Sequence, residues 1–147
     1  MIRGRFGDTS GRPFIDGRLI VRKLGIYDYV SFCIDTGSDE TVLLPVDSLR
    51  MALDFGKLKD RSDSCSLSGI CSLYTVPATV QFISSECIYS YTIDLKVAPV
   101  SPAVMQLPSI IGRNIIDNWS MNYCRSKNRL NIKILSADHM IEADPIP

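Results

Sequence analysis

Asp35 lies where an apolar segment meets a run of small residues. The segment Phe32–Ile34 leads directly into it, and Thr36, Gly37 and Ser38 follow. A carboxylate at the end of a buried strand is costly unless hydrogen bonds support it. Gly37 can bring a backbone N–H close to the carboxylate, and Thr36 and Ser38 supply short hydroxyl donors. The segment is therefore a candidate acid–base site, although the tripeptide alone is explained more simply by an Asx turn at a strand end.

A second candidate segment, Pro108–Ile116, lies far downstream. Its two β-branched residues, Ile110 and Ile111, stand directly before Gly112. This pattern indicates a buried strand that passes close to other backbone, since glycine has no side chain to prevent the approach. Taken by itself, the segment is better explained as a plain junction between a strand and a helix.

Most of the remaining chain consists of short apolar or alternating segments separated by turn residues, the pattern of an all-β barrel or sandwich. The polar stretch 54–68 is expected to be a loop or the mobile arm of a hairpin, and Pro77 indicates a strand edge or a bulge. Short helices are expected at 46–53 and 113–119. The expected strands are 18–24 and 29–34, forming a hairpin that turns at 25–28, then 41–44, 73–82, 87–97 and 110–112, and a closing hairpin of 120–124 with 129–134.

The composition is that of an ordinary globular protein of one domain. The chain has 147 residues, of which 46% are hydrophobic and 22% are charged. Its 16 basic and 16 acidic residues give a formal net charge of zero, which argues against nucleic acid as a partner. The basic residues near the N-terminus, from Arg3 to Lys23, are expected to form an ordinary solvated face.

Neither a membrane nor a metal is expected as a partner. The first residues lack the apolar core of a signal peptide, and no apolar run approaches the roughly 20 residues that span a bilayer. We therefore expect a cytoplasmic protein. Five cysteines without a C-x-x-C pair, and a single histidine, His139, argue against a zinc site and against a Ser-His or Cys-His catalytic arrangement. No metal and no cofactor are expected.

Taken together, the two candidate segments resemble the retroviral proteases, the retropepsin family. The resemblance rests on residues 35–43 and 110–114, which occur in the family's order, and the strand order agrees over about 12–134. It implies an all-β fold: a small, closed or partly open acid-protease barrel with one short helix and a hairpin flap. The domain would cover 1–135. The polar tail, 136–147, is not expected to form a strand and would be loose, packed at a subunit interface, seated in the cleft or removed by self-cleavage.

The resemblance also implies roles for individual residues. Asp35 would be the catalytic aspartate, with Thr36 bonded across a dimer axis and Gly37 offering its carbonyl to substrate. Asp39 would bind the substrate backbone and pair with Arg113. The loop would be supported structurally by Ser38 and Arg113, and further substrate contacts would come from Glu40, from the subsite residue Ile110 and from the flap tip at Ser68, Gly69, Ile70, Cys71 and Ser72.

One catalytic aspartate is only half of such a site. Peptide hydrolysis of this type uses two carboxylates that share a proton, because like charges about 3 Å apart cannot both ionise easily. The nearest second motif, Asp8-Thr9-Ser10-Gly11, lacks both the preceding apolar strand and the Asp-Thr-Gly order. We therefore expect a symmetric homodimer that contributes Asp35 from each subunit and acts on a peptide or an unfolded protein.

Ser38 departs from the viral pattern. The viral enzymes usually have alanine at this position, whereas cellular pepsin-like enzymes usually have serine or threonine. A hydroxyl that donates to the outer oxygen of Asp35 favours the ionised carboxylate. The sequence thus predicts a more acidic activity optimum than an alanine version would have.

Two functions other than cleavage stay open. The chain could be a binding or adaptor module that kept the fold and lost activity, or a dimeric scaffold whose tail binds a partner. The combined presence of Asp35, Thr36, Gly37, Asp39 and Arg113 argues against such loss, because only the site needs all five. The expected flap also has a plainer explanation as an ordinary surface hairpin.

Overall fold

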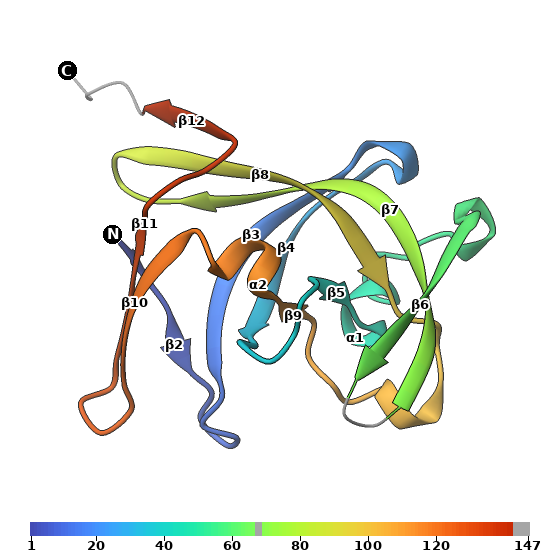
Figure 1. The fold of residues 1–147 in the computed structure, drawn as a ribbon, viewed down its shortest axis with the longest axis horizontal. Coiled ribbons are helices and arrows are strands. Elements are labelled where there is room, and N and C mark those ends of the chain that lie inside the picture. The colour runs from blue at the N-terminus through green and yellow to red at the C-terminus, as the bar shows by residue number, and fades with distance from the viewer. Residues whose placement is uncertain (67–68, 143–147) are drawn as a thin grey trace.

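This computed structural model describes residues 1–66 and 69–142, with the backbone alone for 62–66 and 69–71. The chain folds into a β barrel whose strands close on one another, so the expected all-β barrel is confirmed (Figure 1). Each strand is hydrogen-bonded to the next, and a pairing of the last strand with the first closes the ring. In order around the barrel, the strands are β3 (Pro13–Val21), β4 (Ile26–Ile34), β9 (Ile110–Ile111), β5 (Val42–Leu43), β8 (Cys87–Val97) and β7 (Gly69–Ile83).

Three further strands extend this sheet: β2 (Arg5–Phe6), which pairs with β3, β6 (Asp60–Ser66), which pairs with β7, and β12 (His139–Glu142), which pairs with β8. The β6–β7 pairing makes an antiparallel hairpin, so the expectation of a hairpin arm within 54–68 is confirmed. The strand β8 has the bounds expected from the alternating pattern at 87–97.

The expectation that the tail, 136–147, forms no strand is wrong, because β12 pairs antiparallel with the first residues of β8. Two hydrogen bonds bring the chain to this edge. The Tyr91 hydroxyl donates to the Ser136 carbonyl at 2.7 Å, and the Asp138 carboxylate accepts from the Thr92 N–H at 2.7 Å. All β12 residues are exposed, so the strand has no alternation of buried and exposed positions for the sequence to reveal.

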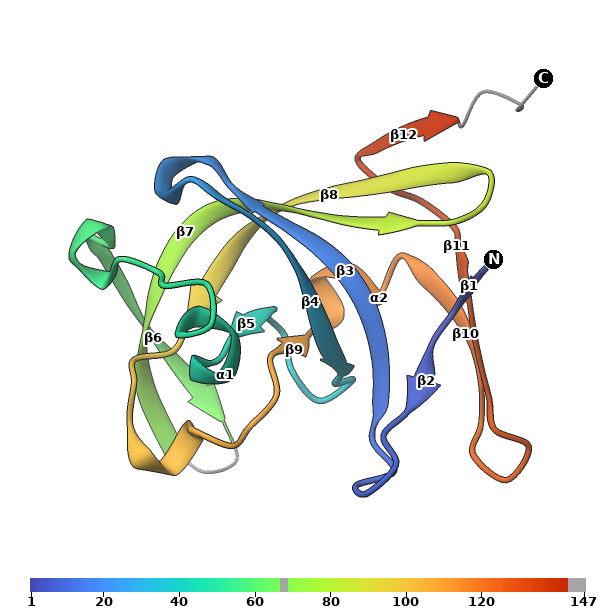
Figure 2. The ribbon, with the colours of Figure 1, turned by 180° about the vertical axis from the view of Figure 1, so that it is seen from behind.

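A separate three-stranded sheet lies beside the barrel and consists of β1 (Ile2–Arg3), β11 (Arg129–Ile134) and β10 (Trp119–Cys124). The expected closing hairpin is confirmed as β10 and β11. In both views, β1, β10 and β11 lie together at one side of the molecule (Figures 1 and 2). The strands β1 and β2 are not expected from the sequence, because two residues carry no periodicity.

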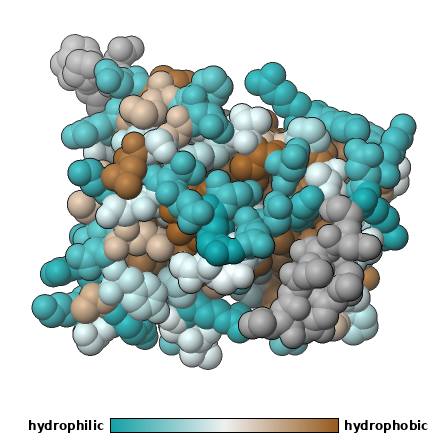
Figure 3. All heavy atoms as spheres, viewed as in Figure 1, coloured by the Kyte–Doolittle hydropathy of each residue, from teal (hydrophilic) through white to brown (hydrophobic). Residues whose placement is uncertain are grey.

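One continuous core joins the barrel to the three-stranded sheet. Phe82 of β7 meets Trp119 of β10 edge to face, with ring centroids 5.1 Å apart, and Trp119 Nε1 donates to the Tyr91 hydroxyl at 3.0 Å. Ile132 of β11 is fully buried in the same core. Burial of apolar side chains of this kind stabilises a fold by about 1.5–3 kcal/mol each. The surface on the side of Figure 1 is largely polar, with apolar residues visible between polar ones (Figure 3).

The helices are shorter than expected. The helix α1 (Pro45–Ser48) begins at a proline, which suits the first turn, but it ends well before residue 53. The helix α2 (Arg113–Ile116) ends before Trp119, which belongs to β10. The described residues thus contain two short α-helices where the resemblance implied one. Within them, no helix is long and apolar enough to cross a membrane.

Gly25 and Pro77 show how single residues fix strand boundaries. The β3–β4 turn is the 3₁₀ helix η1 (Arg22–Leu24) followed by Gly25 at φ 66°, a left-handed conformation that favours glycine, so β4 starts earlier than expected. Pro77 pairs with β8 on one side of β7. On its other side, pairing with β6 stops at Thr75 and pairing with β3 starts at Thr79. Pro77 therefore lies at a local edge, as expected, where no N–H donor is needed.

Candidate active site

The short strand β9 brings the two candidate segments together. It lies between β4 and β5, pairing in parallel with Cys33 and Ile34 of β4 and antiparallel with Val42 of β5. The chain leaves β4 at Asp35 and returns in β5, so the connecting loop, 35–41, must cross the end of β9. Residues far apart in the sequence thereby meet, as the resemblance to the retropepsins implied.

The Asp35 carboxylate is held in place from its own loop. Its Oδ1 accepts the Gly37 N–H at 2.9 Å, which confirms the expected backbone support. The Asp35 N–H donates to the Ile111 carbonyl at 3.0 Å and fixes the residue against β9. The side chain is half-buried, and Oδ2 has no hydrogen-bond partner among the described residues. One oxygen is thus fixed and the other is available for chemistry.

Gly112 is the point of closest approach between the two segments. A Cβ added there would lie 2.2 Å from the Glu40 carbonyl oxygen and 2.8 Å from that of Ser38. The Arg113 N–H, next along the chain, donates to the Ser38 carbonyl at 2.8 Å, and the Asn114 N–H donates to that of Asp39 at 3.2 Å. Backbone lies directly on backbone here, which confirms the close approach expected of this glycine.

The expected ion pair between Asp39 and Arg113 is also present. Both side chains are largely exposed, at 78% and 48%. Such pairs contribute only about 0.2–1 kcal/mol. We therefore assign this pair to the orientation of the loop on α2 and give it little weight in the stability of the fold.

Thr41 is a site residue that the sequence did not single out. It is fully buried, and its Oγ1 donates to Asn114 Oδ1 at 2.9 Å and accepts the Gly112 N–H at 3.2 Å. This hydroxyl thus joins the end of the active-site loop to the start of α2. The sequence could have indicated this role, because a threonine between a polar loop and an apolar strand needs a hydrogen-bond partner when it is buried.

A second hydrogen-bond network that the sequence did not predict holds the start of β9 in place. Asp47 in α1 is buried, and its Oδ2 accepts the Ser109 hydroxyl at 2.6 Å. Ser109 Oγ accepts the Leu44 N–H at 2.9 Å. Arg50 donates to Asp47 Oδ1 at 3.1 Å, and this hydrogen bond is the main cause that raises the pKa of Arg50. The network fixes the residue immediately before β9 and so supports the floor of the site.

The expectation for the Ser38 hydroxyl is wrong. Ser38 Oγ donates to the Glu40 carbonyl at 2.7 Å instead of to the carboxylate of Asp35. The hydroxyl closes a local turn, because the Glu40 carbonyl is the nearer acceptor once Gly112 holds that stretch of backbone. Ser38 still supports the loop, but the predicted effect on the pH optimum loses its physical basis.

Replacing Ser38 with alanine should therefore leave the pH of maximal activity unchanged. The loss of one intramolecular hydrogen bond should lower the free energy of unfolding by about 0.5–1.5 kcal/mol. Activity measured across pH for both proteins, beside urea unfolding, checks this prediction. An optimum that moves to higher pH in the alanine variant would restore the original assignment to Asp35.

The other residues expected to contact substrate lie in different parts of the structure. Ile110 is half-buried beside the apolar Val42, in a position to line a subsite. Thr36 is exposed and Glu40 half-buried on the loop. The expected flap-tip residues belong to the β6–β7 hairpin. Gly69, Ile70 and Cys71 begin β7 opposite Ser66, Cys65 and Ser64, Ser72 follows in the same strand, and Ser68 is outside the described residues.

Cys33 is the cysteine nearest to Asp35 in the sequence. It is buried, and burial raises the pKa of its thiol; the charge of Arg12 opposes that effect and the charge of Asp35 adds to it. The thiol is therefore neutral near pH 7 and acts as a small apolar group beneath the loop.

Comparison with known proteins agrees with this architecture. No family model matches the chain, and no curated protein matches it. A solved structure does: the crystal structure of a retropepsin-like aspartic protease from Rickettsia conorii superposes with a TM-score of 0.58 at 17% sequence identity, over 97% of this chain and 92% of that one. The chain thus has a retropepsin-like fold, as the two motifs predicted.

Proposed function

We propose that two copies of this chain form an aspartic endopeptidase, with the two Asp35 carboxylates facing each other across a two-fold axis. The observation that carries the proposal is the state of Asp35. One oxygen is fixed by the Gly37 N–H, and the loop around it is fixed by backbone contact with Gly112. The retropepsin-like fold supports the same reading.

The chemistry would follow from the shared proton. Of two carboxylates close together, one is ionised and the other protonated, because both charges cannot be accommodated. The ionised Asp35 takes a proton from a water, whose oxygen bonds to the scissile carbonyl carbon. The protonated Asp35 of the partner subunit gives its proton to the carbonyl oxygen. Collapse of this intermediate breaks the C–N bond: the carboxyl group that took the water's proton gives a proton to the leaving amine, and the other, now ionised, carboxylate takes a proton from a hydroxyl of the intermediate, which leaves a carboxylic acid and a pair that again shares one proton.

The substrate we propose is an extended segment of a peptide or an unfolded protein. The half-buried Ile110 and its neighbour Val42 give the site an apolar wall that suits apolar side chains. The β6–β7 hairpin would cover the bound segment as a flap, with Gly69, Ile70 and Cys71 near its tip. We also propose a cytoplasmic location, which the free thiols of Cys33, Cys87 and Cys124 support.

Incubation of the purified protein with a denatured protein from acidic to neutral pH tests this function. We expect fragments that disappear when a pepstatin-type inhibitor is added or when Asp35→Asn replaces the wild type. The Asp35→Asn change is nearly isosteric and keeps an oxygen for the Gly37 N–H, so the variant should stay folded. Fragments that persist unchanged in this variant, or no cleavage at any pH, would overturn the proposal and favour a binding module.

A further inference from the structure

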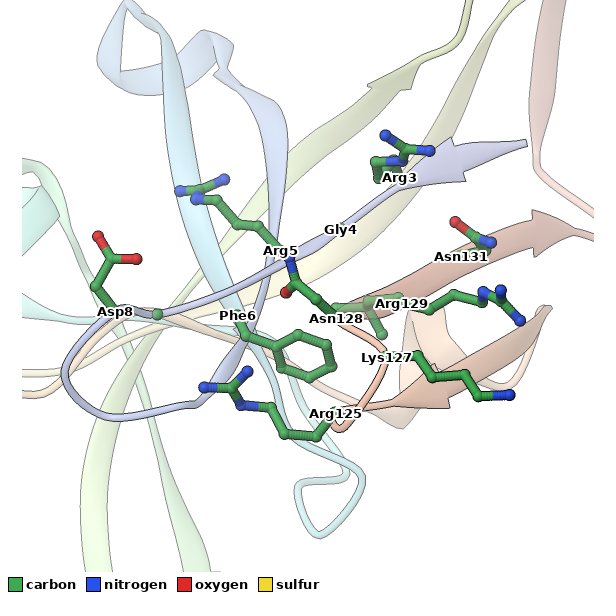
Figure 4. Close-up of a pocket in the computed structure, with 12 residues that line it drawn as sticks. Arg3, Gly4, Arg5, Phe6, Asp8, Arg125, Lys127, Asn128, Arg129 and Asn131 are labelled. Carbon is green, nitrogen blue, oxygen red and sulfur yellow. The ribbon is translucent and has the colours of Figure 1, made fainter.

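A cleft opens where the barrel and the three-stranded sheet part. It encloses about 680 Å³ between Gly4–Asp8 on one side and Arg125–Asn131 on the other (Figure 4). The two sides of the cleft meet at Gly4. The Gly4 N–H donates to the Leu130 carbonyl at 2.8 Å, and a Cβ added to Gly4 would lie 2.6 Å from the Leu130 side chain. Backbone contacts therefore shape the cleft, and the residues that line it do not include Asp35.

The charge in this cleft is unbalanced. One lining residue, Asp8, is acidic, whereas the basic ones are Arg3, Arg5, Arg125, Lys127 and Arg129. Only Arg5 is paired, to Asp16 at 2.7 Å. The other four have no carboxylate partner among the described residues. Like charges gathered in a concave surface reinforce one another's field and attract anions.

Arg125 is already positioned for an anion. Its guanidinium lies over the Phe6 ring, 5.1 Å from the centroid, and Tyr123 packs against the same ring in a T-shaped arrangement, with the two ring centroids 5.1 Å apart. An added Cβ on Gly11 would lie 3.5 Å from Arg125 Nε, so the side chain reaches across to the opposite loop. No carboxylate of the described residues pairs with this guanidinium, so its N–H groups can donate to a carboxylate or a phosphate.

The outer face of the three-stranded sheet continues this surface. Arg3 lies opposite Asn131 in the register, and Arg129 is two residues along the same strand, so all three side chains share a face. Figure 4 shows them with Lys127 along one side of the cleft. Lys133 follows on the same face, and β1, β10 and β11 contain no acidic residue. Cations and amide donors thus extend from the cleft along an extended strand.

We propose that this cleft and the adjoining sheet face bind an acidic or phosphorylated peptide segment, at a site separate from Asp35. The donors follow a strand, which suits an extended chain carrying oxyanions at intervals. The planar guanidinium groups suit carboxylates and phosphates alike. The inference concerns binding only and does not depend on whether the chain cleaves peptide bonds.

A peptide fits the cleft better than a nucleic acid does. Single strands are usually held by aromatic side chains that stack on the bases. The one aromatic ring among the residues that line the cleft, Phe6, is already in contact with the Arg125 guanidinium over its face and with the Tyr123 ring. The formal net charge of the chain is zero, so no long-range field attracts a long polyanion. A short acidic segment needs only the local excess of positive charge in the cleft.

Fluorescence anisotropy tests the proposal on full-length Asp35→Asn protein, which keeps the probes intact. The probes are labelled peptides of equal length that alternate serine with glutamate, phosphoserine with glutamate, or serine with glutamine. We expect binding of the two acidic probes only, with the phosphorylated one tighter, and weaker binding at about 200 mM than at about 50 mM salt. The change Lys127→Gln with Arg129→Gln should raise Kd by about tenfold, since each removes a charge-assisted contact.

The matched control is Arg22→Gln with Lys23→Gln, which removes the same charge from the exposed turn η1. It should leave Kd unchanged. Arg125→Gln is a second variant within the cleft and should also raise Kd. Its thermal unfolding shows whether it is folded. If the control pair raises Kd as much as the cleft pair does, the change in affinity comes from net charge alone, and the proposal is overturned. Tighter binding of a single-stranded RNA of equal charge would also overturn the proposal. If the cleft variants change the oligomeric state of the protein but leave peptide binding unchanged, the proposal is overturned as well, and the cleft is then a contact between subunits.

Discussion

Replacing Gly112 with alanine should abolish cleavage and lower the free energy of unfolding by about 3 kcal/mol, the upper end of overpacking costs. The added methyl would lie 2.2 Å from the Glu40 carbonyl oxygen and 2.8 Å from the Ser38 carbonyl oxygen. Both neighbours are backbone, so no side-chain rotation relieves the clash. The loop 35–41 has to lift from β9, and the Asp35 carboxylate lifts with it.

Gly56→Ala is the matched control for this change. Gly56 lies in the surface 3₁₀ helix η2 (Phe55–Lys57), and an added Cβ there meets only a side-chain oxygen of Asp54 at 3.1 Å. Urea unfolding at one fixed protein concentration and cleavage of a denatured substrate measure both variants. Wild-type activity in Gly112→Ala would show that the contact with the loop is not what positions Asp35.

The parts of the site that the sequence predicted are those in which residue type alone limits the options. Gly112 is predictable because no other residue allows such close backbone contact, and Gly37 because the carboxylate of Asp35 needs a nearby N–H. The pair of Asp39 and Arg113 followed from the retropepsin resemblance. Each of these is present in the structure.

The parts that the sequence missed depend on a choice between several partners. The Ser38 hydroxyl could reach either the Asp35 carboxylate or the Glu40 carbonyl, and only the tertiary position of the loop decides between them. Asp47 was expected only as one residue of a short helix, with no partner assigned to it. It is buried because Ser109, brought beside it by β9, satisfies its carboxylate.

The same limit applies to the strands. The long alternating strand β8 was predicted to the residue, because alternation over many positions is a strong signal. The short strands β1, β2 and β12 form because an edge of a longer strand is available, a property of the neighbour and not of their own residues. The cleft that we propose as a peptide site is bounded by two of these strand regions, so it too was not visible in the sequence.

Mixing wild-type and Asp35→Asn subunits in equal amounts should reduce activity to about a quarter of that of the same total amount of wild type. In a symmetric dimer with random exchange, about a quarter of the dimers have two wild-type subunits, and only these have both carboxylates. A mixed dimer keeps one Asp35, but its asparagine cannot share the proton. The structure motivates this experiment, because Asp35 keeps one carboxylate oxygen without a hydrogen-bond partner among the described residues, and the sequence contains the Asp-Thr-Gly motif once.

The dilution control is wild type mixed with an equal amount of an inert protein, which should keep about half of the activity, since half of the subunits remain and all of them pair with one another. Energy transfer between separately labelled subunits establishes that exchange is complete before the assay. Activity near a half after complete exchange would mean that each Asp35 works alone, and the shared site would have to be abandoned. Activity near a quarter requires a site that is divided between two chains, because only a joint requirement makes the remaining activity follow the square of the wild-type fraction.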